Sequence, residues 1–195
     1  MISRKLIILL FILSVLFGGA IDAVAGTSMA TGAPVVPPAG FIGFCVKHPE
    51  MCLGAEAAPA APVKLTWRHA RELEDVQMRV NGRVAPRAMP ANAWDYPTDG
   101  TGDCNRYALE KQRELLELGW PRDALLLTVA ITERGEGHLV LVATTDEGDF
   151  VLDNRYPRVR PWEAMPYRWI ARQSREQAAE WVGLAGAPVQ VAETR

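Results

Sequence analysis

The apolar residues of this chain change their spacing at Pro121, and no other feature of the sequence constrains the fold as strongly. Before Pro121, apolar residues recur at helical spacing in two segments, one from Thr66 to Asn81-Gly82 and one from Cys104 to Gly119. After Pro121, the apolar runs are short and typical of strands. These runs are residues 124–132, 138–144, 149–154 and, more weakly, 167–173. We therefore predict an α+β fold with helices packed on a short antiparallel sheet.

The N-terminus has the pattern of an export signal. Arg4 and Lys5 precede an apolar run from Leu6 to Phe17, which is followed by small residues and an Ala23-Val24-Ala25 cleavage site. We predict that residues 1–25 are a signal peptide and that the mature chain is periplasmic or secreted. A retained membrane anchor is the alternative, although the run is shorter than the roughly 20 apolar residues that span a bilayer.

The rest of the chain has the pattern of one domain with loose ends. Residues 26–40 are rich in Ala, Gly, Thr and Pro and are interpreted as a linker, because such a stretch cannot bury a core of its own. The predicted domain covers residues 41–183, with a last helix that Ser174 caps and that runs through Val182. Residues 184–195 form a tail. The formal net charge of −2 gives no basic surface, so we expect no nucleic-acid partner.

The three cysteines divide into a pair and a single residue. Cys45 and Cys52 lie close together in the sequence, which in an oxidising compartment favours a local disulfide. The alternative is a metal site formed by Cys45, His48 and Cys52, but no fourth ligand is evident. Cys104 is then left as the odd thiol.

Three residues in the order Cys, His, Asp indicate a thiol peptidase. Cys104 stands in the first turn of the second predicted helix, where unpaired amides and the positive end of the helix dipole stabilise a thiolate. His138 begins an otherwise apolar strand, and an imidazole buried there needs a polar partner. Asp153 closes the next strand. Taken singly, the cysteine has the character of a small core residue and the aspartate that of a turn residue.

The two strands predict how His138 and Asp153 meet. A hairpin symmetric about residues 145–148 places Asp153 opposite Val140, two positions from His138 and therefore on the same face of the sheet. The two residues would be diagonal neighbours with backbones about 7–8 Å apart, a gap that an imidazole and a carboxylate can bridge. A slip of one residue in the register would put them on opposite faces.

The chemistry gives each of the three side chains a separate task. The thiolate of Cys104 attacks, the imidazole of His138 holds it ionised and protonates the leaving amine, and the carboxylate of Asp153 fixes the imidazole tautomer. A tetrahedral intermediate also needs hydrogen-bond donors. The backbone N–H of Cys104 is one candidate, and the indole N–H of Trp94 is the other.

Several short motifs occur in one order between about Phe41 and Val182. They are Phe-Cys…His-Pro-Glu…Cys, Trp-x-Tyr-Pro, Gly-Asp-Cys followed by Tyr-Ala-x-x-Lys, Gly-His-x-Val-Leu, Val-Leu-Asp-Asn, and Tyr167 with Arg172-Gln173-Ser174. Together they resemble the bacterial transglutaminase-like cysteine proteinases, a group that includes the LapG-like periplasmic proteases. The resemblance implies a papain- or transglutaminase-like scaffold on which Cys104, His138 and Asp153 form a triad that hydrolyses a peptide bond.

The resemblance also implies a calcium site around the nucleophile, with Asp before the cysteine and Glu-Asp after it. Here Asp103 is present, but Asn105 and Arg106 stand where the two acids would be. The exchange removes two negative charges and adds a positive one, so we expect no strong calcium site and no required cofactor. Arg106 is expected instead to help hold the thiolate, or to pair with Asp103 or Glu136.

The resemblance further implies a protein substrate of the large surface-adhesin kind and a regulatory inner-membrane receptor as a partner. Two other functions remain open from the sequence. A catalytically inactive binding module is one, because the residues beside the nucleophile are altered. The other is an amidase or acyl transferase, which would use the same three residues and could transfer the acyl group to an amine.

Overall fold

The structure, a computed structural model, describes residues 27–53, 61–90 and 92–185. The predicted signal peptide (residues 1–25) and all but the first two residues of the predicted tail lie outside the described residues. Among the helices of the described part, none is long and apolar enough to cross a membrane.

The centre of the fold is a seven-stranded sheet in which every pairing is antiparallel. Its spatial order is β1-β9-β8-β4-β5-β6-β7. The strands are β1 (Thr31–Val35), β4 (Leu125–Ile131), β5 (Gly137–Thr145), β6 (Gly148–Leu152), β7 (Arg160–Pro161), β8 (Arg168–Gln173) and β9 (Trp181–Leu184). A separate parallel pair joins β2 (Ala85–Pro86) to β3 (Thr101–Gly102).

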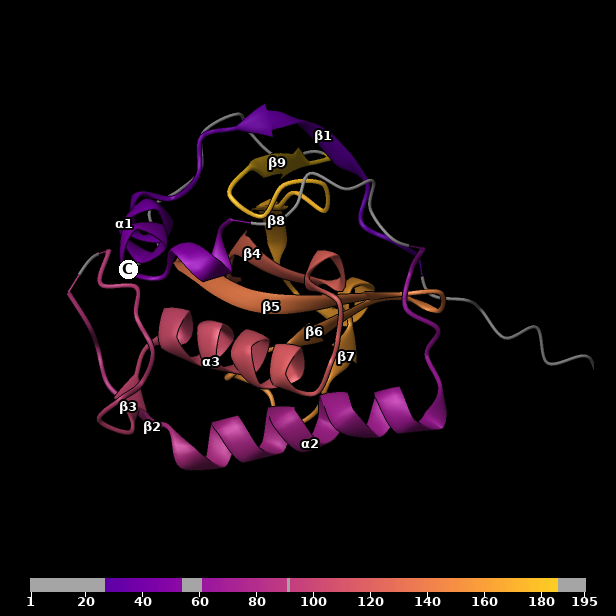
Figure 1. The fold of residues 1–195 in the computed structure, drawn as a ribbon, viewed down its shortest axis with the longest axis horizontal. Helices are drawn as coiled ribbons and strands as arrows, with labels where there is room; N and C mark the ends of the chain where they lie inside the picture. Colours follow the sequence, from indigo (N-terminus) through magenta and orange to yellow (C-terminus); the bar gives the residue numbers. More distant parts are fainter. Residues whose placement is uncertain (1–26, 54–60, 91, 186–195) are drawn as a thin grey trace, which may run out of the picture.

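Three α-helices and three 3₁₀ turns complete the described chain. They are α1 (Ala39–Lys47), α2 (Trp67–Arg83), α3 (Cys104–Glu117), η1 (Pro49–Met51), η2 (Arg122–Ala124) and η3 (Trp162–Ala164). Helix α3 packs against β4 and β5, and α2 packs against α3 (Figure 1). The sheet, α3 and α2 therefore form successive layers, and α3 is the layer between the other two.

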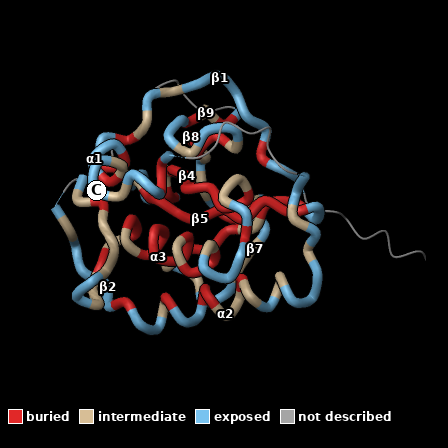
Figure 2. The backbone as a smooth tube through the Cα atoms, viewed as in Figure 1, coloured by how far each residue is buried: buried red, intermediate tan, exposed pale blue. Residues whose placement is uncertain are grey.

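The central strand β5 is buried on both of its faces. Leu139 and Leu141 belong to the main core beneath α3, whereas Val140 and Val142 belong to a second apolar cluster on the other face of the sheet. Figure 2 shows the same concentration of buried segments in α3, β4 and β5. Side chains alternate between the faces of a strand, so a strand covered on both faces is apolar throughout. Any polar residue on β5 therefore lies in the core.

The α+β prediction and the four strand-like runs are confirmed, because these runs correspond to β4, β5, β6 and β8. The prediction of a last helix from Ser174 to Val182 is wrong. Ser174 Oγ does accept hydrogen bonds from the backbone N–H groups of Glu176 and Gln177, at 3.1 and 3.3 Å. The chain then turns into β9, since Trp181 buries its indole completely against Phe41.

Two further boundaries differ from expectation. Residues 31–35, predicted to be part of a linker, form β1 and pair with β9 along the edge of the sheet. Their side chains are mostly exposed, so the segment is ordered by backbone hydrogen bonds that apolar patterning does not reveal. Helix α2 also continues past the predicted stop at Asn81-Gly82 and ends at Arg83.

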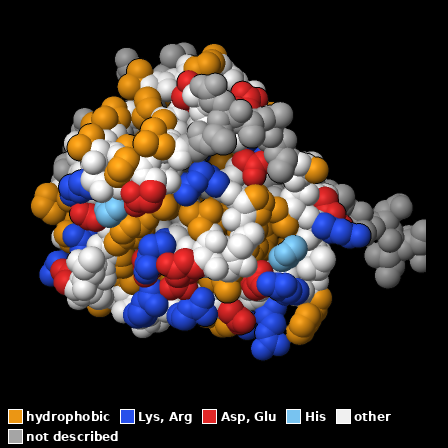
Figure 3. All heavy atoms as spheres, viewed as in Figure 1, with side chains coloured by type: hydrophobic (Ala, Val, Ile, Leu, Met, Phe, Trp, Pro, Cys, Tyr) orange, Lys and Arg blue, Asp and Glu red, His pale blue; other side chains and the backbone are white. Residues whose placement is uncertain are grey.

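Ion pairs join α2 to α3 on the outer side of the helix layer. Arg79 contacts Glu114 at 2.7 Å, and Arg83 pairs with both Glu110 and Glu114. Figure 3 shows basic and acidic side chains lying side by side over these two helices. The extra residues at the end of α2 thus place Arg83 within reach of α3.

The predicted disulfide between Cys45 and Cys52 is present. It links the last turn of α1 to the residue after η1 and encloses His48. The imidazole of His48 contacts Asp95 at 3.1 Å. The disulfide consumes both thiols, so the alternative metal site at Cys45, His48 and Cys52 is not formed.

Gly40 of α1 offers a direct test of packing. A Cβ at Gly40 would overlap the indole of Trp94, whereas a Cβ at Gly43 on the same helix would meet no atom within 4 Å. We expect Gly40→Ala to lower the free energy of unfolding by about 1–3 kcal/mol through overpacking. We expect Gly43→Ala to leave it unchanged or raise it by up to about 1 kcal/mol through helix propensity. Urea denaturation measures both, and equal effects would contradict the packing described.

Candidate active site

The N-terminus of α3 positions Cys104. Asp103 is the N-cap residue, and its Oδ1 accepts a hydrogen bond from the backbone N–H of Arg106 at 3.3 Å. Cys104 is therefore the first helical residue, as predicted, and its amide has no carbonyl partner within the helix. The thiol is free of disulfides and lies at the boundary of the core, with 9% of the residue exposed.

The β5–β6 hairpin brings His138 and Asp153 together as predicted. Leu141 pairs with Leu152, and Thr145 pairs with Gly148 at the turn, which is the symmetric register. His138 lies near the start of β5, and Asp153 follows β6 directly. His138 Nε2 is 2.8 Å from Asp153 Oδ1, and both side chains are buried. This contact leaves the other ring nitrogen, Nδ1, for a second partner.

Cys104 is the second hydrogen-bond partner of the His138 imidazole. Burial lowers the pKa of His138, but hydrogen bonds with Asp153 and Cys104 more than offset the effect and raise this pKa to about 9. The imidazole is therefore protonated at neutral pH while it lies between a carboxylate and a sulfur. The structure thus brings together Cys104, His138 and Asp153, the three residues that the sequence indicated.

Asp153 is held by hydrogen bonds with three residues, of which His138 is one. Its Oδ2 accepts a hydrogen bond from the Tyr167 hydroxyl at 2.5 Å, and its Oδ1 accepts one from the Arg155 backbone N–H at 2.9 Å. Burial raises the pKa of Asp153, but the hydrogen bonds from His138 and Tyr167 outweigh it, and the pKa is lowered overall. Asp153 therefore remains a carboxylate in spite of its burial.

Helix α2 fixes the backbone at the same point. The side-chain amide of Gln77 donates to the carbonyl oxygens of Asp153 and Tyr156, each at 2.7 Å. Gln77 is fully buried. Sequence reasoning gave no role to Gln77 or Tyr167. The sequence does contain a signal for Gln77: a polar residue on the apolar face of an amphipathic helix requires a buried hydrogen-bond partner.

Asn105 and Arg106, which follow the nucleophile, have different hydrogen-bond partners. The Asn105 amide accepts a weak contact from the Cys104 thiol at 3.8 Å and donates to Asp103 at 3.3 Å. The Arg106 guanidinium donates to Asp99 Oδ1 and to the carbonyl of Thr101, each at 3.2 Å. Its ion-pair partner is thus Asp99, and neither Asp103 nor Glu136 takes that place.

Trp94 lies in the main core. Its indole packs edge-on against Phe41 and Trp181, with ring centroids 6.0 and 6.4 Å away. Its Nε1 is buried and makes no hydrogen bond within the part of the chain that the structure describes. The role of this N–H as a donor to a reaction intermediate stays a prediction.

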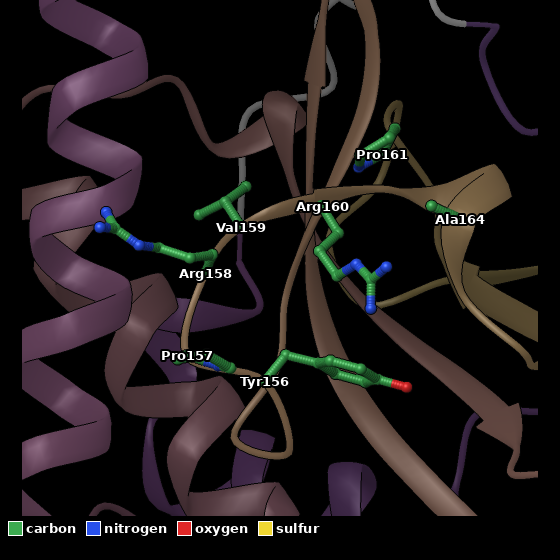
Figure 4. A pocket seen from close by; sticks show the side chains of 7 residues that line it. All are labelled: Tyr156, Pro157, Arg158, Val159, Arg160, Pro161 and Ala164. Atoms are coloured by element: carbon green, nitrogen blue, oxygen red, sulfur yellow. The ribbon is translucent and has the colours of Figure 1, made fainter.

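A hollow of about 410 Å³ lies on the loop that follows Asp153. Its lining includes Tyr156 and Arg160, and the guanidinium of Arg160 lies over the Tyr156 ring, 4.9 Å from its centroid (Figure 4). Arg158 points away from this stack and pairs with Glu74 of α2 at 3.7 Å. The lining contains neither Cys104 nor His138.

A cysteine at the N-terminus of a helix, packed on an antiparallel sheet that presents a paired histidine and aspartate, defines a transglutaminase-like cysteine peptidase. The sequence profile of the bacterial transglutaminase-like cysteine proteinases matches residues 31–188. The chain therefore belongs to that family, and it is a cysteine peptidase. A search of curated protein sequences gives no match.

Solved structures of LapG from Legionella pneumophila have a similar fold. Calcium-bound LapG is 22% identical, with a TM-score of 0.51 over 64% of this chain and 74% of LapG. A further LapG structure is 26% identical, with a TM-score of 0.50 over 62% of this chain and 69% of that one. EGTA-treated LapG is 24% identical, with a TM-score of 0.51 over 63% and 70% of the two chains.

The raised pKa of His138 can be tested by changing its partner. In Asp153→Asn the carboxylate charge is lost while burial remains, so we expect the His138 pKa to fall by about 1 unit or more. A titration of ¹⁵N-labelled histidine by NMR measures this, with Asp146→Asn at the far end of the hairpin as the control. Stability contributed by protonated His138 should be complete below pH 6.5 and lost as the pH rises towards 9. An unchanged pKa in Asp153→Asn would show that another group raises it.

Proposed function

We propose that the protein is an exported peptidase that hydrolyses a peptide bond of a protein substrate, with Cys104 as nucleophile, His138 as acid and base, and Asp153 as the residue that orients His138. The observation that carries this proposal is the 2.8 Å contact between His138 Nε2 and Asp153 Oδ1 beside a thiol at a helix N-terminus. Each group is buried, and each is held by a hydrogen bond that suits its task.

The reaction follows from these positions. The Cys104 thiolate attacks the scissile carbonyl carbon, a C–S bond forms, and the carbonyl electrons move to oxygen. The intermediate collapses as the C–N bond breaks, and His138 gives its proton to the leaving amine. Water then attacks the thioester carbon while His138 accepts a proton from that water. The C–S bond breaks, the acid product leaves, and the thiolate returns with a protonated His138.

Two donors are available for the oxyanion of the intermediate. The Cys104 amide is unpaired within its helix and lies at the positive end of the helix dipole. The Trp94 indole N–H is the second candidate, which its lack of a hydrogen-bond partner within the described residues supports. Each such donor typically contributes about 2.7–4 kcal/mol to the stabilisation of the transition state.

Calcium does not fit the residues around this nucleophile. Calcium requires six to eight oxygen ligands, preferably charged ones. Of the three positions that the resemblance assigns to calcium, only Asp103 is acidic, and its oxygens already accept from Arg106 N–H and Asn105. The guanidinium of Arg106 is only 13% exposed and pairs with Asp99. The charge of Asp99 is therefore already balanced. The groups of acidic, histidine and cysteine side chains in the described residues include no metal-binding cluster.

We therefore expect calcium and EGTA to leave this protein unchanged, although a similar protein, LapG, has been solved with calcium bound. Isothermal calorimetry should detect no heat of calcium binding, and the thermal unfolding midpoint should be the same with either addition. The control is Arg106→Glu, which removes the guanidinium and adds a carboxylate beside Asp103. Calcium-dependent stabilisation of the wild type that Asp103→Asn abolishes would contradict this expectation.

We place the peptidase outside the cytoplasm, in the periplasm or secreted. The disulfide between Cys45 and Cys52 and the pattern of residues 1–25 support this location. The resemblance carried by the sequence motifs favours a surface adhesin as the substrate and a regulatory inner-membrane receptor as a partner.

The activity can be tested without a known substrate. We expect iodoacetamide to alkylate Cys104 rapidly at pH values where an ordinary thiol is protonated, because His138 pairs with the thiolate. His138→Ala should lose this low-pH reactivity by about 100-fold or more. His69→Ala changes a half-buried histidine of α2, which packs against Trp120, and serves as the matched control. Mass spectrometry identifies the alkylated residue.

A mixture of synthetic peptides then distinguishes the alternatives. Hydrolysis by the wild type, absent in Cys104→Ala, supports the peptidase. Incorporation of an added amine in preference to water would mean acyl transfer. Ordinary thiol reactivity with no cleavage would indicate an inactive binding module.

A further inference from the structure

Lys111 is a lysine in the core of the helix layer. It is 0% exposed and lies on α3, seven residues after Cys104, so the two residues share a face of the helix about 10.5 Å apart along its axis. The same face packs against β5, which carries His138. A lysine is almost never fully buried without a partner, so this position requires an explanation.

The ammonium of Lys111 has one aromatic and one electrostatic neighbour. Its Nζ lies 5.9 Å from the centroid of the Tyr107 ring, one turn earlier in α3, and it interacts electrostatically with the carboxylate of Asp153. Nζ is buried and makes no hydrogen bond among the described residues. A methionine could fill the same space without burying a charge, so packing alone does not account for a lysine here.

The charged side chains that face α3 from other elements already have partners other than Lys111. From α2, Arg79 and Arg83 pair with Glu110 and Glu114 on another side of α3. From β5, His138 is hydrogen-bonded to Asp153. Strands β3 and β4 carry no titratable side chain. Asp153 is therefore the anion to which the Lys111 charge couples.

We propose that Lys111 is a positioning residue of the peptidase site, whose buried ammonium adds to the hydrogen bonds that stabilise the Asp153 carboxylate and favours the thiolate of Cys104. This inference rests on the proposed function. Lys111 has no access to substrate and acts through Asp153 and the field along α3. Burial lowers the pKa of Lys111 to about 7, while Asp153 opposes the shift. The positive charge is thus present on the acidic side of neutrality and absent above it.

Because Lys111 is charged only on the acidic side of neutrality, we expect Lys111→Met to shift one of the two pH midpoints of Cys104 alkylation and leave the other unchanged. Alkylation of Cys104 by iodoacetamide should rise in two steps with pH, first as the thiolate forms beside protonated His138 and then as His138 loses its proton. Loss of a cation about 10 Å away should shift the first midpoint upward by about 1 pH unit. The second midpoint, near 9, should not move, because Lys111 is already neutral there.

The matched control is Arg113→Met, which removes a half-exposed cation two residues further along α3. It should leave both midpoints unchanged. A merely structural Lys111 would alter the unfolding midpoint and neither alkylation midpoint, and that result would overturn the proposal. If wild-type Cys104 reacts as an ordinary thiol, the proposed function itself fails. Two steps in the wild type with identical midpoints in Lys111→Met would overturn only the role of Lys111.

A measurement on the wild type covers the case in which Lys111→Met does not fold. The ¹³C shift of the Asp153 carboxyl group should show a step near pH 7 that matches the titration of the Lys111 side chain. A carboxyl shift that stays constant between pH 6 and 8 would overturn the proposal.

Discussion

The site depends on the register of the β5–β6 hairpin. Side chains alternate between the faces of a strand, so one register places His138 and Asp153 on the same face and a slip of one residue separates them. The two-residue loop at 146–147 and the positive φ of Gly148 fix this register locally. The burial of β5 on both faces fixes it again, since a slip would exchange the residues of the two apolar clusters.

Burial makes the charged pair of His138 and Asp153 costly in free energy. A buried carboxylate and imidazolium lose their hydration, and breaking such a pair by removing one partner typically costs about 3–5 kcal/mol. The fold offsets this cost with donors from several elements: Tyr167 precedes β8, Gln77 lies on α2, and Arg155 follows the hairpin. The orientation of the histidine is therefore a property of the whole sheet and of the helix that covers it.

Local features of the sequence predicted most of the fold and the centre of the site. The hairpin register could be derived from its turn, and Cys104 could be placed from the helix pattern and its glycine stop at 119. What failed was set by contacts between distant segments. Ser174 makes the hydrogen bonds of a helix cap, yet Trp181 is drawn into the core against Phe41 and the chain becomes a strand. The partner of Arg106 was missed because Asp99 approaches it from a separate loop.

The two ends of the described chain meet at one edge of the sheet, where β1 pairs with β9. Cys104, His138 and Asp153 lie on one continuous stretch from the start of α3 to the residue after β6, and their contacts span fewer residues than the pairing of β1 with β9. Contacts between neighbours in sequence form sooner than contacts that close a long loop. The part of the molecule that carries these three residues can therefore form early in folding. The pairing of β1 with β9 forms later, because β9 is the last strand of the described residues.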